Sequence, residues 1–266
     1  MGRLPRLLAV RSVSAWDLAM CRSRLHVARW GYLTGFRAMI SERRTITDRS
    51  LCRGDLEGLV EDQTPVVLVG CELADEDFSG FNLEGWHFQS CNFKRARLVG
   101  AKLEGSQWTA SRGGFADFTG ADLRGASFRS VDANNSSFRG ASLGSASFVG
   151  CKLTGANFSE AKFLDIHFEE TLLAGAALPK FSFRKAHLKQ LDLQNADLRH
   201  CDFRDAVFEQ CSLRDANLSD ARFEGADLRG ADLGGVRLMD AKRFKGAVIS
   251  RAQASSLLAE LGLVVQ

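Results

Sequence analysis

A five-residue period runs through most of this 266-residue chain and restricts its fold more than any other feature. Stepping by five from Leu68 to Leu238 meets 35 positions, of which 32 are Leu or Phe. These two residue types make up only about a fifth of the chain, so chance would place roughly seven of them there. The register is therefore a structural repeat, and it is expected to extend over residues 66–246.

A second, smaller position lies two residues before each of these centres. It holds Ala, Ser, Cys, Thr or Val in 29 of the 35 cases. A period of five matches neither the helical turn of 3.6 residues nor the alternation of a flat strand, so neither is the basic unit. One large and one small inward residue in every five leaves three residues to face water, which predicts a solenoid.

The clearest copies of the repeat read ANLSD, ARFEG, ADLRG and ADLGG, and this pattern resembles that of the pentapeptide repeat proteins. The resemblance implies an all-β fold, a right-handed quadrilateral β-helix in which four pentapeptides make one coil of twenty residues. The 35 repeats would then form nearly nine coils, stacked over about 40 Å at ordinary strand spacing. The inward centres form the core, and its later aromatic members are Phe128, Phe148, Phe163, Phe168, Phe183 and Phe203.

The cysteines indicate the environment of the protein. Five of the seven, Cys71, Cys91, Cys151, Cys201 and Cys211, fall at the small inward position, where a thiol replaces alanine as a compact apolar group. Free thiols are therefore expected, with a disulfide between the first two as the alternative, and a reducing cytoplasm fits them. No run of residues is long and apolar enough to cross a bilayer, so no membrane partner is expected.

Residues 1–65 lie outside the repeat. Residues 1–44 carry a net charge of +7, whereas residues 66–246 carry a net charge of −1. Three interpretations of the basic extension 1–38 stay open: a targeting segment, a nucleic-acid-binding arm, or upstream sequence before a natural start at Met39. We favour the third interpretation, and we expect residues 1–38 to be disordered. Residues 39–65 are expected to lead into the solenoid and cap it, with Val66–Val69 as the first strand-like side.

Two departures from the pattern predict local irregularities. Phe81 and Trp86 occupy positions that are normally small, which predicts a bulge or an end cap in the early coils. Gly113 and Ala133 replace large centres on one side of adjacent coils, so this side must dent inward or accept a neighbouring ring. Phe115 is the ring expected to fold back there. The favoured cause of these two replacements is sequence variation in a repeat that tolerates substitution. A functional groove or loop on this side is the alternative.

Residues 247–266 begin a different unit. Ser250 and Gln253 form a capping box, and the apolar residues that follow have helical spacing, so a helix is expected, ended by Gly262 in a left-handed turn. The helix and the apolar tail would cover the end of the solenoid, where strand edges are otherwise unpaired. The same tail is predicted to join two copies into a homodimer through Leu257, Leu258, Leu261, Val264 and Val265.

The sequence offers little chemistry. It contains no nucleotide-binding loop, no metalloprotease motif and no clustered cysteine pair, and its aspartates recur because the repeat favours them. His87, His167 and His187 share one outward column, but no cysteine or acidic column completes a ligand set, so solvated histidines are expected. No catalytic residue, cofactor or metal is predicted, and the chain is expected not to be an enzyme.

The C-terminal stretch QASSLLAELGLVV is similar to the end of the quinolone-resistance and albicidin-resistance members of the family. This resemblance implies a dimer that mimics duplex DNA and protects type II topoisomerases, DNA gyrase or topoisomerase IV, against inhibitors such as fluoroquinolones, without binding nucleic acid itself. Acidic residues that could face such a partner gather in two patches: Glu72, Asp75, Glu76 and Asp77, and Glu160, Asp165, Glu169 and Glu170.

Two features depart from that function. The repeat region is nearly neutral, whereas a mimic of DNA needs a strongly acidic surface. The five-residue count also shows no insertion between residues 66 and 246, whereas members that act on gyrase often carry projecting loops. A scaffold or adaptor for another protein partner is therefore the alternative function.

Overall fold

The structure is a computed structural model, and it describes residues 44–61, 64–235, 241–260 and 262–264. The chain divides into two units, Met1–Ser41 and Glu42–Gln266. The expectations for the basic extension 1–38 and for a start at Met39 lie outside the described residues.

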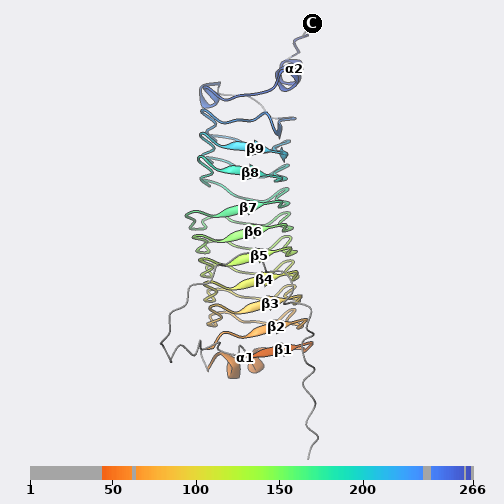
Figure 1. Cartoon of the computed structure of the whole chain (residues 1–266), viewed down its shortest axis with the longest axis vertical. Coiled ribbons are helices and arrows are strands. Elements are labelled where there is room, and N and C mark those ends of the chain that lie inside the picture. The colour runs from red at the N-terminus through yellow and green to blue at the C-terminus, as the bar shows by residue number, and fades with distance from the viewer. Residues whose placement is uncertain (1–43, 62–63, 236–240, 261, 265–266) are drawn as a thin grey trace, which may run out of the picture. The chain divides into compact units, whose positions relative to one another are not determined.

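Short parallel strands, stacked in sequence order, form the main sheet of this unit (Figure 1). From β2 onward, paired residues are twenty apart along the chain, as in Leu68 opposite Phe88. Within the described residues the strands of this sheet are β1 (Thr45–Thr47), β2 (Val67–Val69), β3 (His87–Gln89), β4 (Gln107–Thr109), β5 (Ser127–Arg129), β6 (Ser147–Val149), β7 (His167–Glu169), β8 (His187–Lys189) and β9 (Val207–Glu209).

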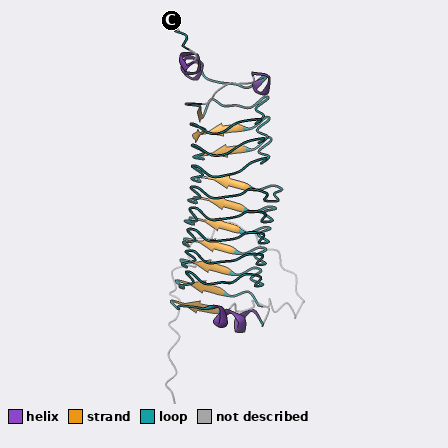
Figure 2. Cartoon of the chain, turned by 180° about the vertical axis from the view of Figure 1, so that it is seen from behind, coloured by secondary structure: helices purple, strands orange, loops and turns teal. Residues whose placement is uncertain are grey.

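Single β-bridges link the coils on their other three sides, for example Glu72 with Asn92 and Asn82 with Lys102. Figure 2 shows the resulting pattern from behind, with strands on one side of the stack and turns on the others. On one of these sides β10 (Cys211–Ser212) and β11 (Ala231–Asp232) form a further parallel pair. The predicted all-β solenoid with coils of twenty residues is thus confirmed.

The last residue of nearly every described pentapeptide turns the chain with a positive φ, with Gly230 as an exception. This angle is +63° at Gly100 and +58° at Asp205. Glycine adopts it without strain because it has no Cβ, and aspartate and asparagine tolerate it better than most other residues. The frequent Gly, Asp and Asn at this position therefore follow from the geometry of the corner.

Leu and Phe centres and the small residues between them fill the interior. Phe148 stacks on Phe128 with ring centroids 4.7 Å apart and meets Phe138 edge-on at 5.7 Å. The predicted core rings are buried at Phe128, Phe148, Phe168, Phe183 and Phe203, whereas Phe163 is only partly buried. The five inward cysteines are buried and free, so the alternative disulfide does not form.

The sheet begins earlier than the sequence predicts. Ile46 of β1 lies opposite Leu68 of β2, so Val66–Val69 is the second strand-like side of the stack and not the first. These partners are 22 residues apart because helix α1 (Arg53–Val60) interrupts the first coil, and a search by fives therefore misses β1. The Arg53 guanidinium of α1 lies 4.5 Å from the centroid of the Phe81 ring, so α1 contacts one of the two large residues at normally small positions; the end cap itself stays a prediction.

Near the C-terminal end of the described solenoid, one coil departs from the spacing of twenty residues. Phe244, in the 3₁₀ helix η1 (Ala241–Phe244), stacks on Phe223 at 4.9 Å, and Val248 pairs with Asp227. Both pairs are 21 residues apart, so this coil holds one residue more than the regular ones. The expectation that no insertion interrupts residues 66–246 is therefore wrong by one residue. The count by fives ended at residue 238, before the slip becomes visible.

Helix α2 (Arg251–Glu260) follows the last coil. The Gln253 N–H donates to Ser250 Oγ at 3.2 Å, and the Ser250 N–H donates to Gln253 Oε1 at 2.6 Å, so the predicted capping box is present. Gln253 Nε2 also donates to the carbonyls of Leu228 and Ala231, at 2.7 and 2.6 Å. It thereby satisfies two backbone acceptors of the final coil. No helix in the described parts of the chain is long and apolar enough to span a membrane.

Small residues line the side that lacks large centres: a Cβ added at Gly113 would meet the Cβ atoms of Ala116 and Ala133 at 3.8 and 4.0 Å. Trp108, five residues before Gly113, is buried. Its ring contacts two neighbouring phenylalanines at centroid distances of 4.7 and 5.6 Å, and its Nε1 donates to a serine hydroxyl at 3.0 Å. Phe115 is 58% exposed, and its expected inward folding is wrong because it occupies the outward corner position, where its φ is +62°.

Candidate partner-binding surfaces

Outward side chains form columns, because residues twenty apart lie on adjacent coils. Opposite charges meet along these columns, as where Arg97 Nη1 lies 3.0 Å from the Asp77 carboxylate. Further cross-coil pairs in the described residues join Glu104 with Arg124, Arg139 with Glu160, Glu169 with Lys189, Arg184 with Asp205, His187 with Glu209, and Arg214 with Asp232. The surface charge is therefore compensated locally.

The first predicted acidic patch is engaged in such pairs. Asp75 accepts hydrogen bonds from the Arg95 guanidinium, which lower the pKa of Asp75 below its usual value. The other members also have partners: Asp77 with Arg97, Glu72 with the side-chain amide of Asn92, and Glu76 with the backbone N–H of Arg53. A basic partner would have to compete with these contacts.

The second patch is similar. Lys189 Nζ lies 3.2 Å from Glu169 and 3.8 Å from Glu170, and the hydrogen bonds from Lys189 and then His167 lower the pKa of Glu169. Glu160 pairs with an arginine, and Asp165 alone of this patch has no ion pair within the described residues. Neither patch offers a run of uncompensated negative charge, which a protein needs to compete with DNA phosphates.

The histidine column also contacts carboxylates. His187 Nε2 lies 3.0 Å from Glu209, and His167 Nε2 lies 3.5 Å from Glu169. Across the residues that the structure describes, no group of three or more His, Cys, Asp and Glu side chains is placed to hold a metal ion. His167 and His187 are thus exposed side chains in surface pairs, whereas His87 is half-buried.

The predicted dimer residues fall into two groups. Leu257 is buried, so it covers the end of the solenoid, whereas Leu258 and Val264 are 37% and 86% exposed. Gly262 adopts the predicted positive φ, +78°. Leu261 and Val265 lie outside the described residues, and the dimer itself remains a prediction.

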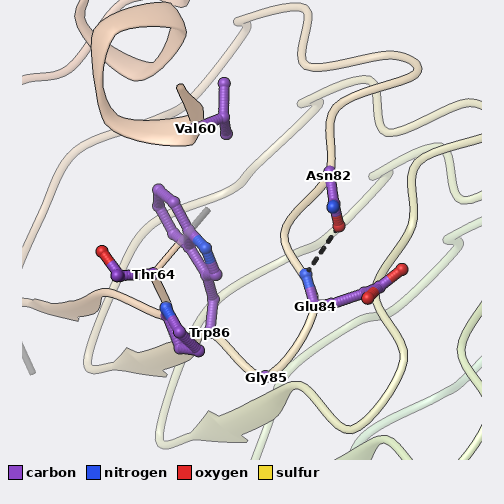
Figure 3. A pocket seen from close by; sticks show the side chains of 7 residues that line it. Val60, Thr64, Asn82, Glu84, Gly85 and Trp86 are labelled. Carbon is purple, nitrogen blue, oxygen red and sulfur yellow. Dashed lines mark hydrogen bonds between the residues drawn. The ribbon is translucent and has the colours of Figure 1, made fainter. Parts of the chain in front are cut away.

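A hollow of about 370 Å³ lies beside the end of α1 (Figure 3). It is lined by Val60, Thr64, Pro65, Asn82, Glu84, Gly85 and Trp86. Asn82 Oδ1 accepts a hydrogen bond from the Glu84 N–H at 3.3 Å, so its side chain holds a turn of the coil. Among these described lining residues there is no set of chemically reactive side chains.

A break in the coil contacts lies between residues 160–167 and 179–187, and it is called the open seam below. On regular coils the N–H of each centre donates to a carbonyl of the next coil, as from Leu143 to Lys162 at 2.6 Å. The last residue of a pentapeptide and the residue before a centre donate to adjacent coils in the same way, as from Gly155 to Ala174 and from Lys162 to Ala141. Along the seam, five of these inter-coil bonds are absent from the described structure; their donors would be the N–H groups of Glu160, Phe163, Asp165, Ser182 and His187.

Phe181 explains the seam. It occupies a normally small position yet is fully buried, stacked on Phe163 at 4.0 Å and lying 6.0 Å from Phe183. The rings of Phe163, Phe181 and Phe183 thus pack together between these two coils, where regular coils place two stacked centres. Accordingly β7 and β8 share one register pair, where other strand pairs of the sheet share three, and Figure 1 shows them farther apart than their neighbours. The sequence indicates this irregularity, because Phe181, like Phe81, is a large residue at a normally small position of the repeat.

The sequence and fold were compared with known proteins. The family description "Pentapeptide repeat region" matches residues 64–138 and 165–238, and "Pentapeptide repeats (8 copies)" matches residues 134–163. None of the curated proteins compared with the chain matches it.

Several solved structures have a similar fold. A trypsin-treated variant of QnrB1, a plasmid-mediated fluoroquinolone resistance protein, is 24% identical with a TM-score of 0.47, over 76% of this chain and 98% of that one. Full-length QnrB1 is 21% identical with a TM-score of 0.41, over 83% and 98%. HetL, a pentapeptide repeat protein involved in heterocyst differentiation regulation in the cyanobacterium Nostoc sp. strain PCC 7120, is 21% identical with a TM-score of 0.44, over 70% and 86%. Nothing about the partner of this chain follows from these likenesses.

Proposed function

The chain belongs to the pentapeptide repeat family, and we propose that it is a non-catalytic scaffold that binds a protein partner along the outward columns of its solenoid. The observation that carries the proposal is the charge pairing between coils, such as Arg97 with Asp77 at 3.0 Å. Paired columns give a nearly neutral outward surface. Solenoids of stacked repeats use such extended surfaces to bind other macromolecules.

The same pairing disfavours mimicry of DNA. Each acidic patch would have to break contacts with its own arginines and lysines before it could hold basic groups of a topoisomerase. Exposed pairs are individually weak, about 0–1 kcal/mol, but their cations would remain on the surface and repel a basic partner.

The buried cysteines support a reducing compartment, and we place the protein in the cytoplasm. Cys71 and Cys91 lie on adjacent coils and are both free. Burial raises the pKa of Cys91 to about 12, so this thiol stays protonated and unreactive at neutral pH.

Photo-crosslinking in the cells that make the protein tests the scaffold function. A photoreactive amino acid is placed at one exposed outward position on each side of the coil: Gln89, Glu104, Arg139 and Thr154. A covalent adduct with one protein, formed on illumination from one or two adjacent sides, is the expected result. Absence of protein adducts from all four positions, with each variant folded, would contradict the function.

Protection of a type II topoisomerase is the second candidate, favoured by the apolar residues left exposed on α2 and after it. Leu258 and Val264 are free to pack against a second copy, and a two-fold dimer would suit a two-fold enzyme. The test adds the purified protein to DNA gyrase with a fluoroquinolone and measures supercoiled and cleaved DNA. Restored supercoiling that is lost in Leu258→Asp, together with a change from dimer to monomer, is the supporting result. No binding to gyrase or topoisomerase IV at micromolar concentration would leave the scaffold function alone.

A further inference from the structure

The open seam makes part of the apolar core accessible. Ala161, Phe163, Ile166 and Ala186 occupy inward positions of the repeat, but they are only partly buried. The residues twenty positions before Ala161, Phe163 and Ile166 are fully buried; they are Ala141, Leu143 and Ala146. Beside them the Leu164 side chain is 72% exposed. The exposed leucine and the accessible core positions together form an apolar patch, and such patches mark interaction sites.

The backbone at the seam also has hydrogen-bonding capacity that the chain does not use. The N–H groups of Phe163, Asp165 and Ser182 have no backbone acceptor within the described structure, in contrast to their counterparts on regular coils. Backbone N–H groups are strong donors that take an acceptor wherever one is in reach. Carbonyl or carboxylate oxygens of a bound segment would supply such acceptors.

The charges around the seam are predominantly positive. Lys162, Lys180 and Lys185 are exposed and form no ion pair within the described residues, whereas Asp165 is the one acidic residue there without such a pair. Arg184 adds a further cation, 4.0 Å from Asp205. On a surface where most columns are compensated, this cluster favours an acidic ligand.

We propose that the open seam is where the scaffold holds its partner, and that the partner contributes an acidic segment with an apolar anchor. The apolar side chain packs on Leu164 and the partly exposed Phe163, while flanking carboxylates meet Lys162 and Lys185 and accept from the free N–H groups. This assignment rests on the scaffold function proposed above, and it names the chemistry of the ligand that the scaffold takes.

Selection from a phage-displayed library of random twelve-residue peptides tests the chemistry. Selection is run in parallel against the wild-type protein, Leu164→Asp and the matched control Leu172→Asp, which changes another exposed leucine on a different side of the same coil. Peptides enriched on the wild type and on the control, but not on Leu164→Asp, should carry Asp or Glu around one aliphatic or aromatic residue. Equal enrichment on all three proteins, enrichment of basic or uncharged peptides, or no enrichment would each overturn the proposal.

A binding measurement with the most enriched peptide then tests the charges. Fluorescence anisotropy should show about tenfold weaker binding for Leu164→Asp. A similar loss is expected for the double variant Lys162→Glu and Lys185→Glu, which should also reduce the dependence of affinity on salt. The control double variant Lys94→Glu and Lys152→Glu reverses two lysines that also lack ion pairs in the described residues, on another side. Equal losses in the two double variants would overturn the charge assignment.

The two proposals fail in different ways. A photoreactive amino acid at Leu164 that gives no adduct, while positions on other sides do, would leave the scaffold function intact and move the binding site away from the seam. Absence of adducts at Leu164 and at all four other positions would remove both.

Discussion

Replacing Phe181 by alanine should allow the two coils at the open seam to close. The ring is fully buried against Phe163 and near Phe183, and removing a buried phenylalanine ordinarily costs about 3–5 kcal/mol. At this position, however, alanine is the residue that the repeat usually carries, and a smaller side chain removes the obstacle between the coils. The loss of packing is therefore set against a gain in backbone hydrogen bonds.

The expected size of that gain follows from the five inter-coil bonds that are absent along the seam in the described structure. Each backbone hydrogen bond contributes about 0.5–1.5 kcal/mol net, so full closure would recover about 3 kcal/mol or more. Phe181→Ala should therefore destabilise the protein by less than about 2 kcal/mol. Phe148→Ala is the matched comparison, because Phe148 is equally buried but sits between regularly bonded coils.

Hydrogen exchange and denaturant unfolding measure the two sides of this balance. In the wild type the amides of Phe163, Asp165, Ser182 and His187 should exchange faster than their counterparts on neighbouring coils, and in Phe181→Ala they should become protected. Two results would refute the reasoning: seam amides that are already protected in the wild type, or a loss of stability in Phe181→Ala equal to that in Phe148→Ala without new protection.

Three further predictions concern the core, the cap and a surface pair. Phe148→Ala should lower the free energy of unfolding by about 3–5 kcal/mol, while Arg139→Ala, at a side chain that is 56% exposed, should change it by less than about 0.5 kcal/mol; similar effects would mean that the inward register is wrong. Gln253→Ala removes the acceptor of the Ser250 N–H in the capping box and the bonds to the Leu228 and Ala231 carbonyls, so it should cost about 1–3 kcal/mol and increase exchange of the α2 amides; Ser255→Ala, in the same helix, is the control. The hydrogen bond from Arg204 lowers the pKa of Asp202 below the reference value of 3.8, so the pair should stabilise the fold above that pH and lose its contribution as the pH falls further. The stability difference between the wild type and Asp202→Asn, about 1 kcal/mol at neutral pH, should therefore shrink below pH 3.8, and a difference that is constant with pH would contradict it.

The five-residue period by itself determined the solenoid, its inward register and the burial of the five cysteines. A strictly periodic sequence repeats one local conformation, so the position of a residue within its pentapeptide already says whether it faces the core. The C-terminal capping box could also be derived, because Ser250 and Gln253 are close in sequence and satisfy backbone groups within one helical turn.

Only the tertiary structure decided what happens where the pattern fails. β1 pairs across a helix that breaks the count, and the slip before Phe244 becomes visible only through its stacking on Phe223. Two large residues at small positions also had different outcomes: Phe81 lies beneath the Arg53 guanidinium of α1, whereas Phe181 separates two coils in the middle of the stack. The reason is that the position of a residue within its pentapeptide predicts whether its side chain points inward. The space available to that side chain depends on residues of the adjacent coils, which are distant in the sequence.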